Sequence, residues 1–388
     1  MLGPMRLGVF GILIAALFAG SAAVQAQFQI QDSHSTASFR GVHAIGNGIA
    51  WVSGTEGTVL RTTDDGTTWQ RCSTPPGADR LDFRGIQAFD ENIAIVMSSG
   101  KGDLSRLYKT NDGCKSWKLV FTNPDKEGFW DAIKFEPKQK LFGSVIGDPV
   151  NGRFASFLTF DRGDRWERRR VLPEALDGEG LFAASNTSLV LQNDGISPEA
   201  FVTGGPRGSR LLQTFVCGGG DADCFELGDF GPIKSTDKNR GKLEQVYWQA
   251  EPLPLAKGPS AGSFSIGVDE HSEYWYRAVI VGGDYKKPDS DKLTAAYRNL
   301  RTGRYLPAQT PPHGYRSAVA YDSANKTWIT VGPNGTDISR DDGRNWTSLR
   351  PTPNDKRDAD KNWNALSLPF AVGPDGRIGK LRPESLRQ

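Results

Sequence analysis

Short apolar runs that end at glycine recur along the chain. Examples are Ile49–Gly54, Ala278–Gly283 and Trp328–Gly332, which are rich in β-branched and aromatic side chains. Runs of this kind, bounded by turn-forming residues, predict β-strands rather than helices. The 45 glycines and 23 prolines among 388 residues also favour many short strands, because both residue types interrupt helices. We therefore expect an all-β fold.

An eight-residue frame, S/T-x-D-x-G-x-x-W, occurs four times and resembles the Asp-box, or BNR repeat, of sialidase-like and related β-propellers. The hydroxyl and carboxylate can bind turn amides, glycine takes positive φ, and tryptophan opens the next strand. We interpret the frame as a structural turn and assign its aspartates no catalytic role. The second copy departs from the frame, with Cys114 at the glycine position. The aspartates and tryptophans of the four copies are Asp64 and Trp69, Asp112 and Trp117, Asp161 and Trp166, and Asp341 and Trp346.

A second repeat, an aromatic residue followed by a variable and usually a small one, counts the structural units. The intervals are roughly 44 to 52 residues, apart from one of about 82, and this spacing is typical of four-stranded propeller blades. We assign the excess length to an insertion at about residues 217–242 in the fourth unit. The seven members begin at Phe39, Phe83, Trp130, Phe182, Phe264, Tyr315 and Trp363.

The last unit, from Trp363 to Leu381, has room for only three strands. The segment Gln27–Ile30 precedes the first repeat and can supply the fourth, which would remove both exposed sheet edges. The prediction is a seven-bladed β-propeller with Asp-box turns, formed as a single domain by residues 27–388 and closed by an N-terminal strand that completes the last blade.

Residues 1–26 have the pattern of a secretory signal peptide. Arg6 is followed by the apolar run Leu7–Phe18 and by small residues up to Ala26. The alternative, an uncleaved anchor helix, is less favoured because the apolar run is about 12 residues long and a span needs about 20. We expect cleavage near Ala26 and export to the periplasm or the extracellular space.

Four cysteines, an even number in an exported chain, permit disulfides. Cys217 and Cys224 are close in sequence and would leave Cys72 for Cys114, although the sequence leaves all three connectivities open. The spacing lacks a CxxC pair and the four histidines are scattered, so we expect no metal site.

The balance of charge excludes some partners. Forty-seven Lys and Arg residues against 45 Asp and Glu residues give a net charge of +2, so we expect no nucleic-acid partner, and membrane association only through a partner. The sequence contains no dinucleotide fingerprint, P-loop, HExxH or GxSxG motif in a suitable context, so no cofactor is expected.

If the seven triplets lie on innermost strands, alternation buries each aromatic residue between blades and turns the variable residue toward the central channel. Three Arg and one Asp would then give the channel a local positive charge. Arg pairs well with carboxylates and phosphates, so we hypothesise binding of an anion or a carboxylate-bearing peptide. The alternative is that Asp131 pairs with a neighbouring Arg and water fills the channel. The predicted ring consists of Arg40, Arg84, Asp131, Ala183, Ser265, Arg316 and Asn364.

Several segments extend the resemblance to the whole mature chain. Trp51–Gly54 followed by Gly57–Thr62, and Val372–Ile378, resemble photosystem II stability/assembly factor-like propellers of the WD40/YVTN-like group, which include plant members. Phe129–Ala132 with Gly147–Pro149, Val281–Tyr285 and Gly314–Ser317 resemble exported bacterial members outside photosynthesis. The resemblance implies a non-enzymatic scaffold for a protein or peptide partner; in the photosynthetic members that partner is a membrane-protein precursor.

The alternative function is a sialidase-like or other glycan-acting glycosyl hydrolase. Arg40, Arg84 and Arg316 could form the arginine triad of such enzymes, but Phe39–Val42 lacks the Ile-Pro that follows Arg in that family. No Tyr–Glu pair can be assigned, and Asp148 and Asp284 at strand ends are interpreted as turn caps. We assign no catalytic residue. A hydrolase would require a placed carboxylate pair, whereas a scaffold would not.

Overall fold

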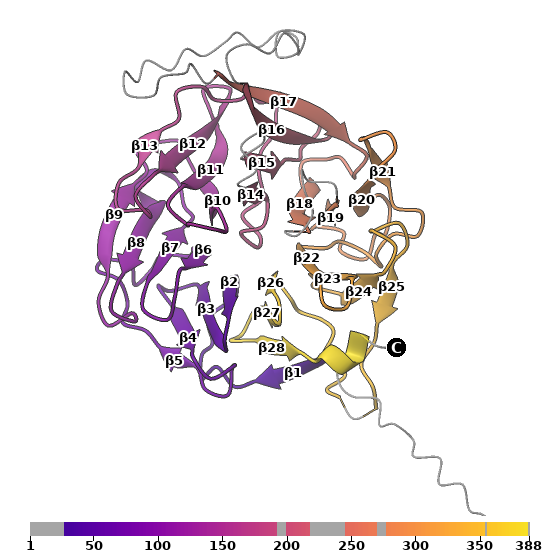
Figure 1. Cartoon of the computed structure of the whole chain (residues 1–388), viewed down its shortest axis with the longest axis horizontal. Coiled ribbons are helices and arrows are strands. Elements are labelled where there is room, and N and C mark those ends of the chain that lie inside the picture. Colours follow the sequence, from indigo (N-terminus) through magenta and orange to yellow (C-terminus); the bar gives the residue numbers. More distant parts are fainter. Residues whose placement is uncertain (1–26, 192–198, 218–244, 270–276, 354, 387–388) are drawn as a thin grey trace, which may run out of the picture.

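The computed structural model describes residues 27–191, 199–217, 245–269, 277–353 and 355–386. Within these residues, 28 strands form seven antiparallel four-stranded sheets arranged around a central axis (Figure 1). The chain is therefore a seven-bladed β-propeller, which confirms the predicted fold class and number of blades.

Each blade runs from an innermost strand to an outer strand. The innermost strands of blades 1 to 7 are β2 (Phe39–Gly46), β6 (Phe83–Ala88), β10 (Trp130–Phe135), β14 (Leu189–Leu191), β18 (Ala261–Val268), β22 (Ala318–Asp322) and β26 (Ala365–Ser367). The second strands are β3 (Ile49–Gly54), β7 (Ala94–Ser98), β11 (Gly143–Val150), β15 (Glu199–Val202), β19 (Ala278–Asp284), β23 (Thr327–Gly332) and β27 (Phe370–Val372).

The third strands are β4 (Val59–Thr62), β8 (Arg106–Thr110), β12 (Arg153–Thr159), β16 (Ser209–Cys217), β20 (Ala295–Arg298), β24 (Gly335–Ser339) and β28 (Ile378–Leu381). The outer strands are β5 (Gln70–Arg71), β9 (Lys118–Thr122), β13 (Glu167–Arg168), β17 (Gln245–Leu253), β21 (Tyr305–Pro307), β25 (Thr347–Leu349) and β1 (Phe28–Gln31). Two short 3₁₀ helices, η1 (Gly102–Leu104) and η4 (Pro383–Leu386), complete the described elements.

The hydrophobic core is divided among the interfaces between blades. Each of the seven interfaces in the described part of the chain holds its own apolar cluster, built from alternating residues of the facing sheets. Trp51, Trp130, Trp328 and Trp363 are among the largest fully buried side chains. Each of these tryptophans belongs to a different interface, so its burial holds two neighbouring blades together.

The ring closes as the sequence predicts. β1 pairs antiparallel with β28 in a register that sets Phe28 opposite Leu381. The Phe28 ring also packs on Trp363, with centroids 5.0 Å apart. The first strand thus becomes the outer strand of blade 7, and the indigo and yellow ends of the chain lie side by side (Figure 1).

Blade 4 carries the predicted long interval. β16 pairs with β17, so the stretch expected as an insertion at about 217–242 connects the third and outer strands of this blade. Residues 218–244, with Cys224 among them, lie outside the described residues, and so does the predicted signal peptide over residues 1–26. Among the described residues, no helix has the length and apolar character needed to cross a membrane.

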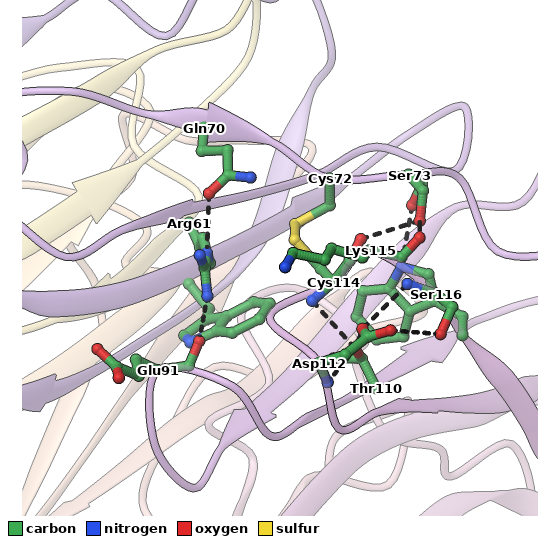
Figure 2. The surroundings of a disulfide bond; sticks show 12 residues. Arg61, Gln70, Cys72, Ser73, Glu91, Thr110, Asp112, Cys114, Lys115 and Ser116 are labelled. Atoms are coloured by element: carbon green, nitrogen blue, oxygen red, sulfur yellow. Dashed lines mark hydrogen bonds between the residues drawn. A yellow bond between two sulfur atoms is a disulfide. The ribbon is translucent and has the colours of Figure 1, made fainter.

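A disulfide joins Cys72, which follows the outer strand of blade 1, to Cys114 in a turn of blade 2 (Figure 2). Two hydrogen bonds reinforce the link: the Ser73 hydroxyl donates to the Cys114 carbonyl at 2.9 Å, and the Trp117 indole donates to the Ser73 carbonyl at 2.9 Å. Blades 1 and 2 are therefore fastened covalently at their outer edge.

The four S/T-x-D-x-G-x-x-W segments adopt the same turn between a third and an outer strand. In the first, Thr62 Oγ1 accepts from the Gly66 amide at 2.9 Å and Asp64 Oδ1 accepts from the Thr68 amide at 2.9 Å. The other three copies repeat both bonds. Each turn also has two successive residues at positive φ. The aspartates are thus engaged by their own turns, away from the channel.

Candidate functional site

Bulges in three successive blades place charged side chains at one mouth of the channel. Arg40, Arg84 and Asp131 are each the extra residue of a β-bulge near the start of an innermost strand. A bulge leaves its extra residue unpaired and re-aims the side chain, and such bulges are common beside functional sites. Together with Asp82 and Asp148, these residues form what we call the charged cluster.

The two guanidinium groups of the charged cluster interact with each other and with one neighbouring carboxylate. Arg84 Nε donates to Asp82 Oδ2 at 2.7 Å, and both side chains are about one-quarter exposed. Burial, followed by the charge of Arg84, lowers the pKa of Arg40. The buried Arg40 Nε has no hydrogen-bond partner among the described residues. Asp82 Oδ1 is also buried without a partner among the described residues, so this part of the mouth leaves both a donor and an acceptor unsatisfied.

Asp131 and Asp148 form a buried carboxyl pair on blade 3. Asp131 is 1% exposed, and burial, followed by the charge of Asp148, raises its pKa well above the usual range. Burial also raises the pKa of Asp148, whose Oδ1 accepts from the Leu181 amide at 3.0 Å. Asp131 Oδ2 has no partner in the described part of the chain. The raised pKa shifts Asp131 toward its neutral form.

Aromatic side chains of blades 4 to 6 form the other half of this mouth. Phe182 stacks on Phe264 with ring centroids 3.9 Å apart, and Tyr315 meets Phe264 edge to face at 4.7 Å. Tyr285 contacts both phenylalanines and is 47% exposed. Burial raises the pKa of Tyr315, and the positive charge of Arg40 opposes this shift, so the two halves adjoin. We call these four residues the aromatic cluster.

The structure corrects the predicted ring in blade 5. The bulged residue there is Phe264, which lies between the paired Ser263 and Ser265. Phe264 thus occupies the position that Arg40 has in blade 1. Ser265 is buried instead, and its Oγ accepts hydrogen bonds from the Val319 amide and the Thr187 hydroxyl. The prediction that Ser265 faces the channel at the level of the arginines is therefore wrong by one residue.

Arg316 does not join the other two arginines. Its side chain is 1% exposed and is bound within blade 6, where Nε donates to Asp337 Oδ2 at 2.8 Å and Nη1 donates to Asn334. The prediction that Arg316 supplies a binding group to the ring is wrong, because the buried Asp337 carboxylate takes its donors. Asn364 is likewise engaged, since its Nδ2 donates to the Phe39 carbonyl at 2.8 Å and links blade 7 to blade 1.

The structure also differs from the predicted ring in blade 4, because a segment of this blade crosses the channel. Phe182–Ala184 precedes β14 and does not lie on an innermost strand. Residues 181–188, which we call the channel plug, bond to blades 2, 3, 5 and 6 in turn. These bonds are Asn186 Nδ2 to the Ile86 carbonyl, the Ile133 amide to Asn186 Oδ1 at 2.8 Å, Thr187 Oγ1 to Ser265 Oγ at 2.8 Å, and Ser185 Oγ to the Ser317 carbonyl at 2.7 Å.

Sequence reasoning missed a Ser–His–Asp cluster in blade 6, formed by Ser348, His313 and Asp337. The Ser348 hydroxyl and the Asp337 carboxylate both contact Nδ1 of His313, each at 2.7 Å. A nucleophilic relay needs the serine and the aspartate at opposite ring nitrogens, so this arrangement does not provide one. Among the described residues, no group of three or more His, Cys, Asp or Glu side chains could hold a metal ion.

Among known proteins, the chain is similar to solved structures but not to any family model or curated sequence. No protein-family model matches the chain. No curated protein matches its sequence. Among solved structures, it is similar to YCF48 bound to D1 peptide, with a TM-score of 0.54, 15% identity and coverage of 92% of this chain and 97% of that chain. It is also similar to YCF48 from Cyanidioschyzon merolae, with a TM-score of 0.51, 18% identity and coverage of 92% and 100%. At these identities the likeness concerns the fold.

Proposed function

We propose that the protein is a non-enzymatic scaffold that binds a protein or peptide partner at the mouth formed by the charged and aromatic clusters. The observation that carries the proposal is the pair of bulges that directs Arg40 and Arg84 to this mouth. In this proposal the two guanidinium groups hold a carboxylate of the partner, either an acidic side chain or a C-terminus.

The chemistry of the two halves suits a peptide. Guanidinium groups donate paired hydrogen bonds to a carboxylate, and this geometry is specific as well as strong. The aromatic cluster offers the exposed ring of Tyr285 to an apolar side chain of the partner. A propeller of the same fold, YCF48, has been solved bound to D1 peptide, which supports a peptide as the class of partner.

The hydrolase alternative receives less support from the geometry. Arg40 and Arg84 lie together, whereas Arg316 is bound to Asp337 within its own blade. The carboxyl pair of Asp131 and Asp148 is near Arg84, but Asp131 is 1% exposed and cannot reach a glycosidic bond from outside. Glycoside hydrolysis needs two carboxyl groups that flank the scissile bond.

The proposed place of action is outside the cytosol. Residues 1–26 have the sequence pattern of a signal peptide, and the Cys72–Cys114 disulfide is stable in oxidising compartments. A cell-fractionation experiment with the full-length chain tests this part of the proposal, since an uncleaved chain in the cytosol would contradict it.

To test the binding proposal, peptides that bind the wild type are selected from a random library whose members carry a free C-terminal carboxylate. Selected peptides are titrated against the wild type, an Arg40→Gln/Arg84→Gln variant, and the matched control Arg301→Gln/Arg304→Gln, which changes two exposed arginines on another part of the surface. We expect the Arg40→Gln/Arg84→Gln variant to lose about tenfold or more in affinity, and the control to lose little. Equal binding by all three proteins, or glycoside hydrolysis by the wild type that the Arg40→Gln/Arg84→Gln variant loses, would overturn the proposal.

A further inference from the structure

A cavity lies at the end of the channel opposite the charged and aromatic clusters, where the innermost strands end. Its volume is about 510 Å³, and residues of the innermost strand regions of all seven blades line it. Thr187 of the channel plug contributes to its wall, whereas Arg40, Arg84 and Asp131 do not. The plug therefore separates it from the proposed peptide site, and its size is that of a small-molecule site.

His43 supplies a fixed hydrogen-bond donor to this cavity. Its Nδ1 accepts from the Ala88 amide at 2.9 Å, so the neutral ring carries its proton on Nε2. Burial, followed by the charges of Lys134 and Lys140, lowers the pKa of His43 to about 3. The ring therefore stays neutral at physiological pH and remains a donor.

The acidic side chains that line the cavity already have partners. The Glu136 carboxylate accepts from the backbone amides of Lys138, Gln139 and Leu141 at 2.8 to 3.2 Å. Asp269 forms an ion pair with Arg277 at 3.7 Å. The lining thus holds two lysines beside two carboxylates whose oxygens already accept hydrogen bonds or an ion pair, and Lys140 Nζ donates to the Phe89 carbonyl at 3.4 Å.

Much of the remaining wall is apolar. Hydrophobic side chains from four blades line the cavity next to the polar groups, and they suit a hydrocarbon or a ring rather than a fully hydrated ion. These side chains are Val190, Val268, Ala320 and Leu368, which are all partly exposed.

We infer that this cavity is a second binding site, for a small molecule that joins a carboxylate or phosphate to an apolar body. The anionic group binds near His43, Lys134 and Lys140, and the apolar part contacts the aliphatic wall. The channel plug closes the far end, so the molecule enters from the face opposite the proposed peptide site. This site is independent of the peptide-binding proposal.

Benzoate is a suitable probe because it combines the two features, and neutral benzamide of nearly the same shape is its control. Isothermal titration calorimetry at low ionic strength is expected to show saturable binding of benzoate that is at least about tenfold tighter than that of benzamide. A parallel titration with inorganic phosphate shows which oxyanion the site prefers. Lys134→Gln/Lys140→Gln is expected to weaken benzoate binding about tenfold, and the matched variant Lys257→Gln/Lys361→Gln is not.

Three outcomes of the titrations with the wild type and the lysine variant would overturn the inference. These are the absence of saturable binding of either anion, equal binding of benzoate and benzamide, and undiminished binding by a correctly folded Lys134→Gln/Lys140→Gln protein, with folding checked by thermal unfolding. Loss of benzoate binding in Arg40→Gln/Arg84→Gln alone would place the anion at the charged cluster and would also contradict it. Retention of benzoate binding in that variant, with loss of peptide binding, would separate the two sites.

Discussion

Cys114 forms a disulfide with Cys72 from the turn position that is glycine in the other three copies of the repeated frame (Figure 2). Its φ is 63°, in the left-handed region that costs a non-glycine residue about 1 to 2 kcal/mol. The preceding residue, Gly113, also has positive φ. Glycine would adopt this φ without that cost. The second turn therefore accepts a strained backbone at Cys114 and gains a covalent link between blades 1 and 2.

Variants without this disulfide should show both the stability that the bond contributes and the cost of positive φ at residue 114. Cys72→Ala/Cys114→Ala is expected to lower the free energy of unfolding by about 2 to 4 kcal/mol. Cys72→Ala/Cys114→Gly is expected to lose about 1 kcal/mol less, because glycine accepts positive φ. Urea unfolding of both variants and of the wild type, with and without dithiothreitol, measures these differences. A wild type that is equally stable when reduced would contradict the first expectation.

The turn aspartates predict a specific loss of stability in acid. The pKa values of Asp64 and Asp112 are lowered to about 2, most strongly by the hydroxyls of Thr68 and Ser116 respectively. Because an unfolded aspartate has a pKa of about 3.9, this stabilisation is present above about pH 4 and is lost as the pH falls to about 2. The difference in Tm between pH 6 and pH 2 should be smaller in Asp64→Asn/Asp112→Asn. An equal difference in Tm in the wild type and in the variant would contradict this prediction.

Asp131 predicts the opposite pH dependence. Its folded-state pKa is raised, so its contribution is favourable below the unfolded pKa of about 3.9 and is lost as the pH rises through the folded value. Asp131→Asn should therefore become more stable relative to the wild type as the pH rises from 4 to 8, by about 1.4 kcal/mol for each pKa unit of the shift. Thermal unfolding across this range measures the gain. Asp148→Asn should reduce this pH dependence, because it removes the charge of Asp148, the second cause of the raised pKa of Asp131.

The channel plug should be sensitive at Asn186. This residue has a φ of 61° and accepts the buried Ile133 amide, so Asn186→Gly keeps the backbone conformation and leaves that amide unpaired. We expect a loss of about 1 to 3 kcal/mol in the free energy of unfolding. Asn362→Gly is a close control, because Asn362 has the same φ but is exposed. Equal losses in the two variants would show that the hydrogen bond contributes nothing.

The blade count was predictable because it depends on periodic features. The aromatic residues Phe39, Phe83 and Trp130 recur at blade spacing and are fully buried between sheets. Ring closure was predictable as well, since the last unit lacked one strand and Phe28 lies in a short segment of alternating polar and apolar residues before the first repeat. Local patterning determines these features, and the structure confirms both.

The candidate site was only partly predictable, because non-local contacts decide it. Arg40 and Arg84 could be placed near the channel from alternation, but the bulge that puts Phe264 in the equivalent position of blade 5 shifts the register by one residue. Arg316 forms an ion pair with Asp337, a residue from another strand. The polar run Ser185–Ser188 was the available signal for the plug, since such residues do not suit the innermost strand expected there.

The pairing of Phe28 with Leu381 also has a kinetic meaning. During synthesis the strand that begins the propeller has no partner until the chain has been made as far as Leu381, and the closure of so long a loop is slow. Until then blade 7 lacks its outer strand and an unpaired edge remains open to other chains. A protease that cuts exposed strands would therefore distinguish finished rings from unfinished ones, and a chain truncated before Ile378 would persist only in the open form.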